Sequence, residues 1–223
     1  LTGASAVGGA ITVSTGTVDA NGTFDATGGA VTFTGAGNLQ LAGVVASLGA
    51  LTDSDFGTVT YDANGDQAIV SDDYVNLIAG GGAGTKTLGG AVTVAGAFTT
   101  DALVTTAMGA NNLTVAGATD INGTVTITTA TLDANGTFDA TDGNVTFTGA
   151  GNLMLSSTVT SLGALTSVGF GTVTYDAPGD QDIVADAYYS LTAGGGSGTK
   201  TLAGNVTVAG NLIIDPVVTI AMD

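Results

Sequence analysis

The chain has 223 residues, with 37 Gly, 19 acidic residues that are all Asp, two Lys, no His, no Cys and no Trp, and its formal net charge is −17. Without Cys or His, the common zinc, haem and iron–sulfur sites and a Ser-His-Asp triad are excluded. The charge predicts that the chain has no nucleic-acid partner, and no apolar run reaches the length of a membrane-spanning helix.

Short apolar and β-branched runs follow one another at intervals of roughly 8–12 residues, with Gly, Asn or Asp between them, which is typical of strands joined by tight corners. No apolar stripe with the period of a helix is present. The sequence therefore predicts an all-β protein. In the first half of the chain the candidate strands are, in order, Ala10–Val13, Thr23–Asp25, Val31–Thr34, Leu39–Leu41, Thr58–Tyr61, Ala68–Val70 and Val92–Val94.

The second half of the chain repeats the first. Thr17–Thr100 aligns without gaps on Thr131–Ile214, an offset of 114 residues, and 59 of these 84 pairs are identical. Identity at this level predicts that both halves share one backbone. We therefore interpret residues 1–114 as copy one and residues 115–223 as copy two.

Two architectures fit such a repeat. The first is a parallel β-solenoid built from the two tandem copies, and the second is a pair of β-sandwich domains in tandem. Pro178 in copy two replaces Asn64 of copy one in an otherwise shared turn, and Pro cannot adopt the positive φ of a tight hairpin turn. This substitution, together with the shortness of the strands, favours the solenoid and leaves the sandwiches as the alternative.

The runs Gly84–Leu88 and Val92–Gly96, and the run Gly198–Val208, resemble the Gly/Thr/Val/Asp-rich repeats of large bacterial surface and autotransporter-like proteins. The resemblance lies in composition and covers most of the chain. It implies a β-solenoid that acts as a stalk, an adhesin or a surface coat. It supplies no site residues.

Asp clusters are the main candidates for chemistry, because Ca²⁺ takes six to eight oxygen ligands and these Asp and Asn residues lie at alternate positions around Gly turns. The alternative is that Asp-x-Asn-Gly serves only as turn chemistry. No metal or other cofactor is required by the sequence. The candidate Ca²⁺ ligands are Asp19, Asn21, Asp25, Asp62, Asp66, Asp133, Asn135, Asp139, Asp176 and Asp180.

Two further sets of residues occupy matched positions in both copies. Lys86 and Lys200 each follow Gly-Thr, and we expect either an exposed ammonium paired with Asp or, less simply, an isopeptide bond to Asn. The matched aromatic residues are expected in the core or in stacks, because repetition argues against a single binding site. They are Phe24, Phe33, Phe56, Tyr61 and Tyr74 in copy one and Phe138, Phe147, Phe170, Tyr175 and Tyr188 in copy two.

No catalytic constellation emerges, so we expect a non-enzymatic protein, extracellular or at the cell surface. The leading interpretation is a structural subunit of a filament, surface layer or stalk that assembles head to tail with itself. The alternative is an adhesin-type module that binds a glycan or another cell surface. A solenoid ends in open strand edges that need a partner. The expected interface residues are Leu1, Thr2, Ile11, Val13, Asp215, Val217, Ile220 and Met222.

Overall fold

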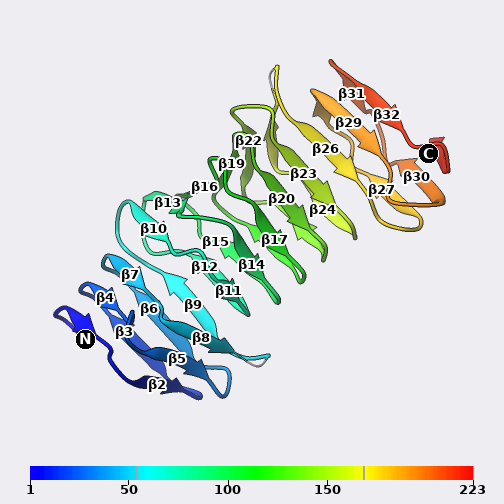
Figure 1. The fold of residues 1–223 in the computed structure, drawn as a ribbon. Coiled ribbons are helices and arrows are strands. Elements are labelled where there is room, and N and C mark those ends of the chain that lie inside the picture. Colours follow the sequence, from blue (N-terminus) through cyan, green and yellow to red (C-terminus); the bar gives the residue numbers. More distant parts are fainter. Residues whose placement is uncertain (54, 168, 223) are drawn as a thin grey trace.

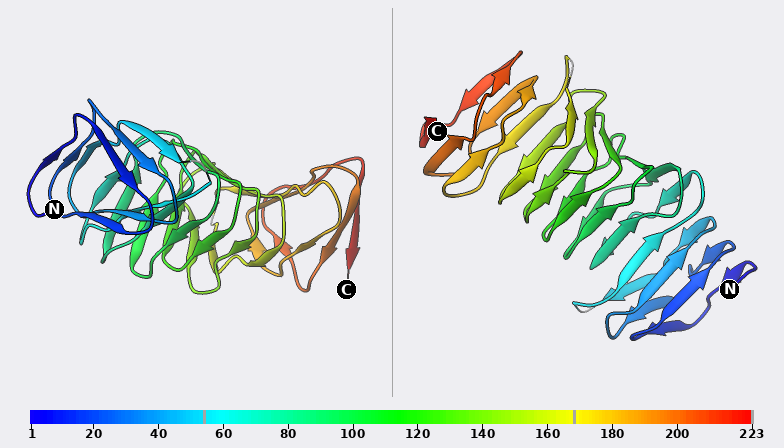
Figure 2. Two further views of the ribbon diagram at one scale, coloured as in Figure 1. Left: turned by 90° about the horizontal axis from the view of Figure 1, so that it is seen from below. Right: turned by 180° about the vertical axis from the view of Figure 1, so that it is seen from behind.

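A computed structural model describes residues 1–53, 55–167 and 169–222 of the chain. All of its paired strands are parallel, and every pair joins two strands that are three places apart along the chain. Three strands thus make one turn, and 33 strands make eleven turns of a rod with the two termini at opposite ends (Figure 1, Figure 2). The predicted β-solenoid is confirmed, and the tandem sandwiches are wrong.

The strands stack in three columns, one for each side of the rod. The first column holds β1 (Ser5–Ala6), β4 (Phe24–Asp25), β7 (Val45–Ser47), β10 (Gln67–Ile69), β13 (Gly84–Leu88), β16 (Val104–Ala107), β19 (Thr124–Ile127), β22 (Asn144–Phe147), β25 (Ala164–Thr166), β28 (Ala187–Tyr188) and β31 (Thr207–Val208). The second column holds β2 (Ala10–Val13), β5 (Ala30–Phe33), β8 (Ala50–Asp53), β11 (Asp73–Tyr74), β14 (Val92–Val94), β17 (Leu113–Val115), β20 (Thr131–Ala134), β23 (Asn152–Leu155), β26 (Thr172–Tyr175), β29 (Ser190–Ala193) and β32 (Leu212–Ile214). The third column holds β3 (Thr17–Ala20), β6 (Asn38–Leu41), β9 (Thr58–Tyr61), β12 (Asn76–Ala79), β15 (Phe98–Thr100), β18 (Thr119–Ile121), β21 (Phe138–Asp139), β24 (Val159–Ser161), β27 (Gln181–Ile183), β30 (Gly198–Leu202) and β33 (Val218–Met222).

Alternation along each strand builds the core. In β23, Leu153 and Leu155 point inward and are buried, while Asn152 and Met154 are partly exposed. Because parallel register places equivalent residues above one another, inward residues form continuous stacks along the rod, such as Leu132, Leu153, Val173 and Leu191. Small side chains at the corners let the chain turn after so few residues.

One corner depends on glycine for a steric reason. A Cβ on Gly136 would fall on the carbonyl of Gly117 in the preceding turn, and a Cβ on Gly22 would fall on the carbonyl of Gly3. The backbones of successive turns approach too closely here for any side chain. These glycines account for part of the high Gly content.

The 114-residue repeat does not contain a whole number of turns. Thr17 of β3 corresponds to Thr131 of β20, so one repeat spans 20 − 3 = 17 strands. Seventeen is not a multiple of three, and copy two is therefore rotated by one column relative to copy one. The boundary between residues 114 and 115 falls inside β17, and the sheets run across it.

Each copy contains one place where two of the three columns lose their strand pairing. In copy one, which we call junction one, β7 does not pair with β10 and β8 does not pair with β11, while β6, β9 and β12 remain continuous. In copy two, junction two separates β24 from β27 and β25 from β28, while β23, β26 and β29 remain continuous. The rotation of the repeat thus moves the continuous side from the third column to the second.

Candidate functional site

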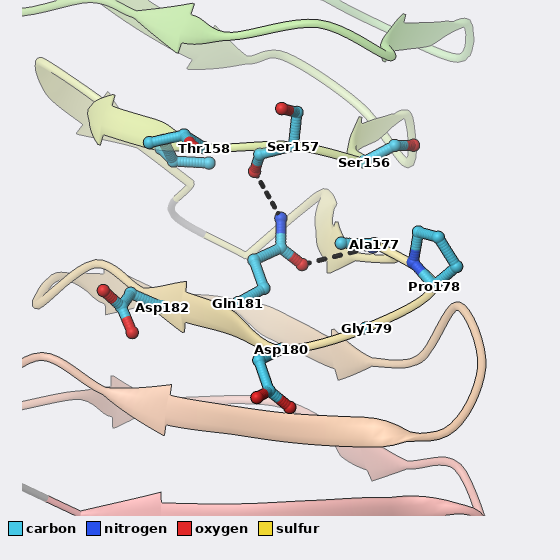
Figure 3. A pocket seen from close by; sticks show the side chains of 10 residues that line it. Ser156, Ser157, Thr158, Ala177, Pro178, Gly179, Asp180, Gln181 and Asp182 are labelled. Atoms are coloured by element: carbon cyan, nitrogen blue, oxygen red, sulfur yellow. Dashed lines mark hydrogen bonds between the residues drawn. The ribbon is translucent and has the colours of Figure 1, made fainter.

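The junctions concentrate the buried polar side chains of the rod. At junction two the amide of Gln181 donates to the carbonyl of Ser157 at 2.7 Å and accepts from the backbone N–H of Ala177 at 3.2 Å (Figure 3). It also donates to the carbonyl of Leu155 at 2.7 Å. At junction one Gln67 makes the same three contacts. One amide side chain thus replaces the strand pairing that the broken column has lost.

A lysine ammonium lies beside each of these amides. Lys86 Nζ donates to the carbonyls of Ala63 at 2.6 Å and Gly65 at 2.9 Å. Lys200 Nζ donates to Ala177 and Gly179 at 2.7 and 3.0 Å, and also to Gln181 Oε1 at 3.2 Å. Both lysines are 0% exposed, so the expected exposed lysine is wrong. The ammonium binds backbone carbonyls, and burial lowers its pKa while the neighbouring carboxylates raise it.

Two buried tyrosines close each junction with a ring of hydrogen bonds. The Tyr74 hydroxyl donates to the Val70 carbonyl at 2.7 Å, and the Val70 N–H donates to the Tyr61 oxygen at 3.0 Å. The Tyr61 hydroxyl therefore donates to Tyr74, at 2.9 Å. Tyr61 lies in β9, Val70 directly follows β10 and Tyr74 lies in β11, so the ring links three successive strands of the rod. Tyr175, Val184 and Tyr188 repeat it in copy two.

Side chains also occupy the second broken edge of junction two. Ser167 Oγ accepts from the N–H of Tyr189 at 3.0 Å and donates to the carbonyl of Ala187 at 3.3 Å. Asp186 Oδ1 accepts from the N–H of Ala187 at 2.7 Å. Unpaired strand edges invite pairing with other chains, and these contacts satisfy the groups that would otherwise be free.

The predicted Ca²⁺ ligands divide into two groups. In the first group, Asp19 and Asp133 lie within strands β3 and β20, and Asp25 and Asp139 are the last residues of the next strands, β4 and β21. Asp25 Oδ1 accepts from the N–H and the hydroxyl of Thr27, and these bonds lower its pKa. Asn21 and Asn135 lie at the corner between the two strands. The bonds from Thr27 to Asp25, and the matched bonds from Thr141 to Asp139, are of the kind expected for turn chemistry.

The second group surrounds the junction turns. Asp66 Oδ1 accepts from the N–H of Thr85 at 2.8 Å, and Asp180 makes the matched bond to Thr199 at 2.7 Å. Asp176 Oδ1 accepts from Ser156 Oγ at 2.8 Å. Ala42 stands at the position of Ser156 in copy one, and the buried Oδ1 of Asp62 has no hydrogen-bond partner among the described residues. Burial raises the pKa of Asp62.

Within residues 1–53, 55–167 and 169–222, no three carboxylates gather into a group that could hold a metal ion by themselves. The oxygen atoms that do converge at the junction turns converge on a lysine ammonium. The Ca²⁺ hypothesis stays a prediction, and its residues do not form one shared site.

The last turn of the rod exposes side chains that are buried at the matched positions of copy one. Met222 is 82% exposed and its counterpart Met108 is 0% exposed, while Leu212 is 55% exposed and its counterpart Phe98 is 0% exposed. A cavity of about 130 Å³ opens at this end of the core, with Leu212, Ile214 and Ile220 among its lining residues. Val217 is exposed and Asp215 is half-buried at the adjoining corner.

The first turn has the geometry of an internal turn. The N–H of Asn21 donates to the Leu1 carbonyl at 2.8 Å, and the N–H of Asn135 donates to the matched Val115 carbonyl at the same distance. Leu1 and Thr2 are exposed and Ile11 is half-buried, but Val13 is buried in the core. Of the expected interface residues at this end, Val13 is therefore covered within the chain itself.

The expectation that the matched aromatics lie in the core or in stacks fails at one pair. Phe56 and Phe170 are 48% and 49% exposed at a corner of each junction, next to the glycines Gly57 and Gly171, which have positive φ. The remaining matched aromatics are buried. Repetition therefore predicted equal environments correctly and burial incorrectly.

A cleft of about 530 Å³ lies at junction two, and its walls include Leu165, Thr166, Tyr189 and Ala209. Tyr189 has no aromatic counterpart, since Val75 stands at its position in copy one. Its hydroxyl makes no hydrogen bond to a described residue, and its ring lies against Gly210.

Sequence reasoning missed the two glutamines, although the run Gly-Asp-Gln after the junction turn is present in both copies. A lone matched Gln among turn residues gives no sign of burial. Searches of protein-family models, of curated proteins and of solved structures returned no match to this chain. The part of the chain that the structure describes contains no helix long and apolar enough to cross a membrane.

Proposed function

We propose that the chain is a structural subunit of an extracellular filament, surface layer or stalk, and that its copies stack head to tail through their terminal turns. One observation carries the proposal: the last turn exposes an apolar surface that, at the matched internal position, is covered by the next turn of the same fold. A second copy would supply such a turn.

The contrast between the ends and the junctions supports this assignment. At the junctions Gln67, Gln181 and Ser167 satisfy the edges of the broken columns. The final turn formed by β31, β32 and β33 carries no described strand on its outer edge. Burying Leu212, Ile214 and Met222 would each contribute about 1.5–3 kcal/mol.

In this proposal, the first turn of one subunit packs against the last turn of the next. Strands β1, β2 and β3 of the first turn correspond to β18, β19 and β20, which follow β17 inside the rod, and Leu1 takes the place of Val115 at the end of β17. With strands of neighbouring turns about 4.8 Å apart, eleven turns advance roughly 53 Å per subunit. A contact of this kind does not close on itself, and it therefore produces a filament.

The burial of both lysines should protect the folded chain from trypsin-like proteases, which suits an extracellular protein. Lys86 and Lys200 are the only cleavage positions for a trypsin-like protease, and both are 0% exposed. Native protein should therefore resist trypsin, and unfolded protein should give three fragments.

The experiment that tests assembly compares the intact chain with a chain lacking Leu1–Ala10 and with Leu212→Asp. The intact chain should sediment as long polymers with an axial repeat of roughly 53 Å by electron microscopy. Both variants should remain folded monomers. Leu103→Asp is the control, because Leu103 is 80% exposed on the side of the rod. An intact chain that stays monomeric at high concentration would contradict the proposal.

The second candidate is an adhesin-type binding module, favoured by the cleft beside Tyr189. The cleft offers the hydroxyls of Tyr189 and Thr166 next to apolar side chains. This combination suits a neutral sugar, which has both hydroxyl groups and apolar C–H faces. Binding of neutral oligosaccharides that is lost in Tyr189→Val, the residue of copy one, would support it. Equal binding by both proteins would exclude this cleft.

A further inference from the structure

The turn Asp62–Asp66 curls around a positive charge. Its carbonyls at Ala63 and Gly65 both point at Lys86 Nζ, and the matched carbonyls of copy two point at Lys200 Nζ. The arrangement is present twice, on different sides of the rod, with side chains that are fully buried.

The neighbours of the ammonium are oxygen atoms. Two are backbone carbonyls, and in copy two the third is Gln181 Oε1. Burial lowers the pKa of Lys86, and the negative charges of Asp62 and Asp66 lie close enough to offset part of that lowering. Carbonyl, amide and carboxylate oxygens are the ligand set of hard cations such as Ca²⁺.

One further oxygen is unused. The Oδ1 atom of Asp62 is buried and has no hydrogen-bond partner among the described residues. A buried carboxylate oxygen without a donor is costly, and a cation nearby offsets part of that cost. The turn therefore holds more ligand capacity than the ammonium uses.

We propose that each junction turn is a cation site that the chain fills with its own lysine, and that the same oxygens bind Ca²⁺ when the ammonium is removed. In the native chain Lys86 and Lys200 occupy the position of the ion, so that the junctions are independent of metal. The proposal does not depend on head-to-tail assembly.

The test replaces the ammonium by an apolar group of similar length, Lys86→Met, and measures the melting temperature with Ca²⁺ and with a chelator. Without Ca²⁺ the variant should melt below the native protein, because the two carbonyls and the two carboxylates lose their positive partner. Millimolar Ca²⁺ should bring the melting temperature of the variant back to that of the native protein. Calorimetric titration should show that each variant chain binds one Ca²⁺ more than the native chain does.

Two controls locate the ion. The native protein should show no extra bound ion, and the double variant Lys86→Met with Asp62→Asn should lose the response to Ca²⁺. Lys200→Met repeats the test in copy two. There the counterpart of Asp62, Asp176, already accepts a hydrogen bond from Ser156. The proposal is overturned if Ca²⁺ changes the melting temperature of the native protein and of both single variants equally, or if it changes the melting temperature of neither variant. It is also overturned if neither variant folds even with Ca²⁺ present.

Discussion

Raising the pH should unfold the rod through its buried tyrosines. Burial raises the pKa of Tyr61 and of Tyr175 to about 12, and it also raises the pKa of Tyr74 and Tyr188. A phenol whose pKa is higher in the folded chain than in the unfolded chain favours folding below pH 10. That contribution is lost as the pH rises towards the folded value.

The magnitude follows from the two pKa values. A difference of two units, from 10 to about 12, corresponds to about 2.7 kcal/mol for Tyr61 and the same for Tyr175. At about pH 11 each tyrosine should already have lost about 1.4 kcal/mol of its contribution. Lys86 and Lys200 act in the opposite sense, since a lowered lysine pKa makes the folded state more stable as the pH rises towards 10.5. Stability should therefore pass through a maximum near pH 10.

The assay is urea unfolding followed by circular dichroism between about pH 8 and pH 12, with phenolate absorbance recorded on the same samples. The four buried phenols should ionise together with the loss of β-structure. Tyr189→Phe is the control, because its hydroxyl bonds to no described residue, and it should leave the pH dependence unchanged. Ionisation of all four buried phenols near pH 10 in a chain that keeps its β-structure would refute the reasoning.

Three substitutions test the polar contacts of copy one. Ala42→Ser should raise the free energy of unfolding by about 1 kcal/mol, because the new hydroxyl can donate to Asp62; an unchanged urea midpoint would contradict this. Gln67→Met should remove the bonds to the Gly43 carbonyl and to the Ala63 N–H, at a cost of about 1–3 kcal/mol for each, while the Leu41 carbonyl keeps the N–H of Asp62; trypsin should then cut at Lys86 before it cuts copy two, and simultaneous cleavage of both copies would argue against it. Thr106→Val should be neutral or stabilising in urea unfolding, because the Thr106 hydroxyl is buried without a partner among the described residues; a loss above 1 kcal/mol would show that the hydroxyl matters.

The sequence by itself determined the repeat and the class of fold. Identity at an offset of 114 residues, short β-branched runs and frequent Gly predicted a solenoid, because short strands with tight corners can bury their apolar side only by stacking on copies of themselves. The candidate strands Ala10–Val13, Thr58–Tyr61 and Val92–Val94 match β2, β9 and β14. Strands such as β3 and β13 were missed, since Asp19 and Lys86 interrupt their apolar pattern.

The tertiary structure alone decided how the repeat maps onto turns. Only the strand count shows that 17 strands fill no whole number of three-stranded turns, so that matched residues lie on different sides of the rod. It also decided where polar groups go. In the sequence, Gln67 and Lys86 have the polarity of surface residues. At junction one both side chains are buried and donate hydrogen bonds to backbone carbonyls. Their burial is favourable because a buried carbonyl without a hydrogen-bond donor costs more free energy than burying a side chain that donates to it. Phe56, whose repetition as Phe170 predicted a core or stacking position, is 48% exposed beside Gly57, which has a positive φ.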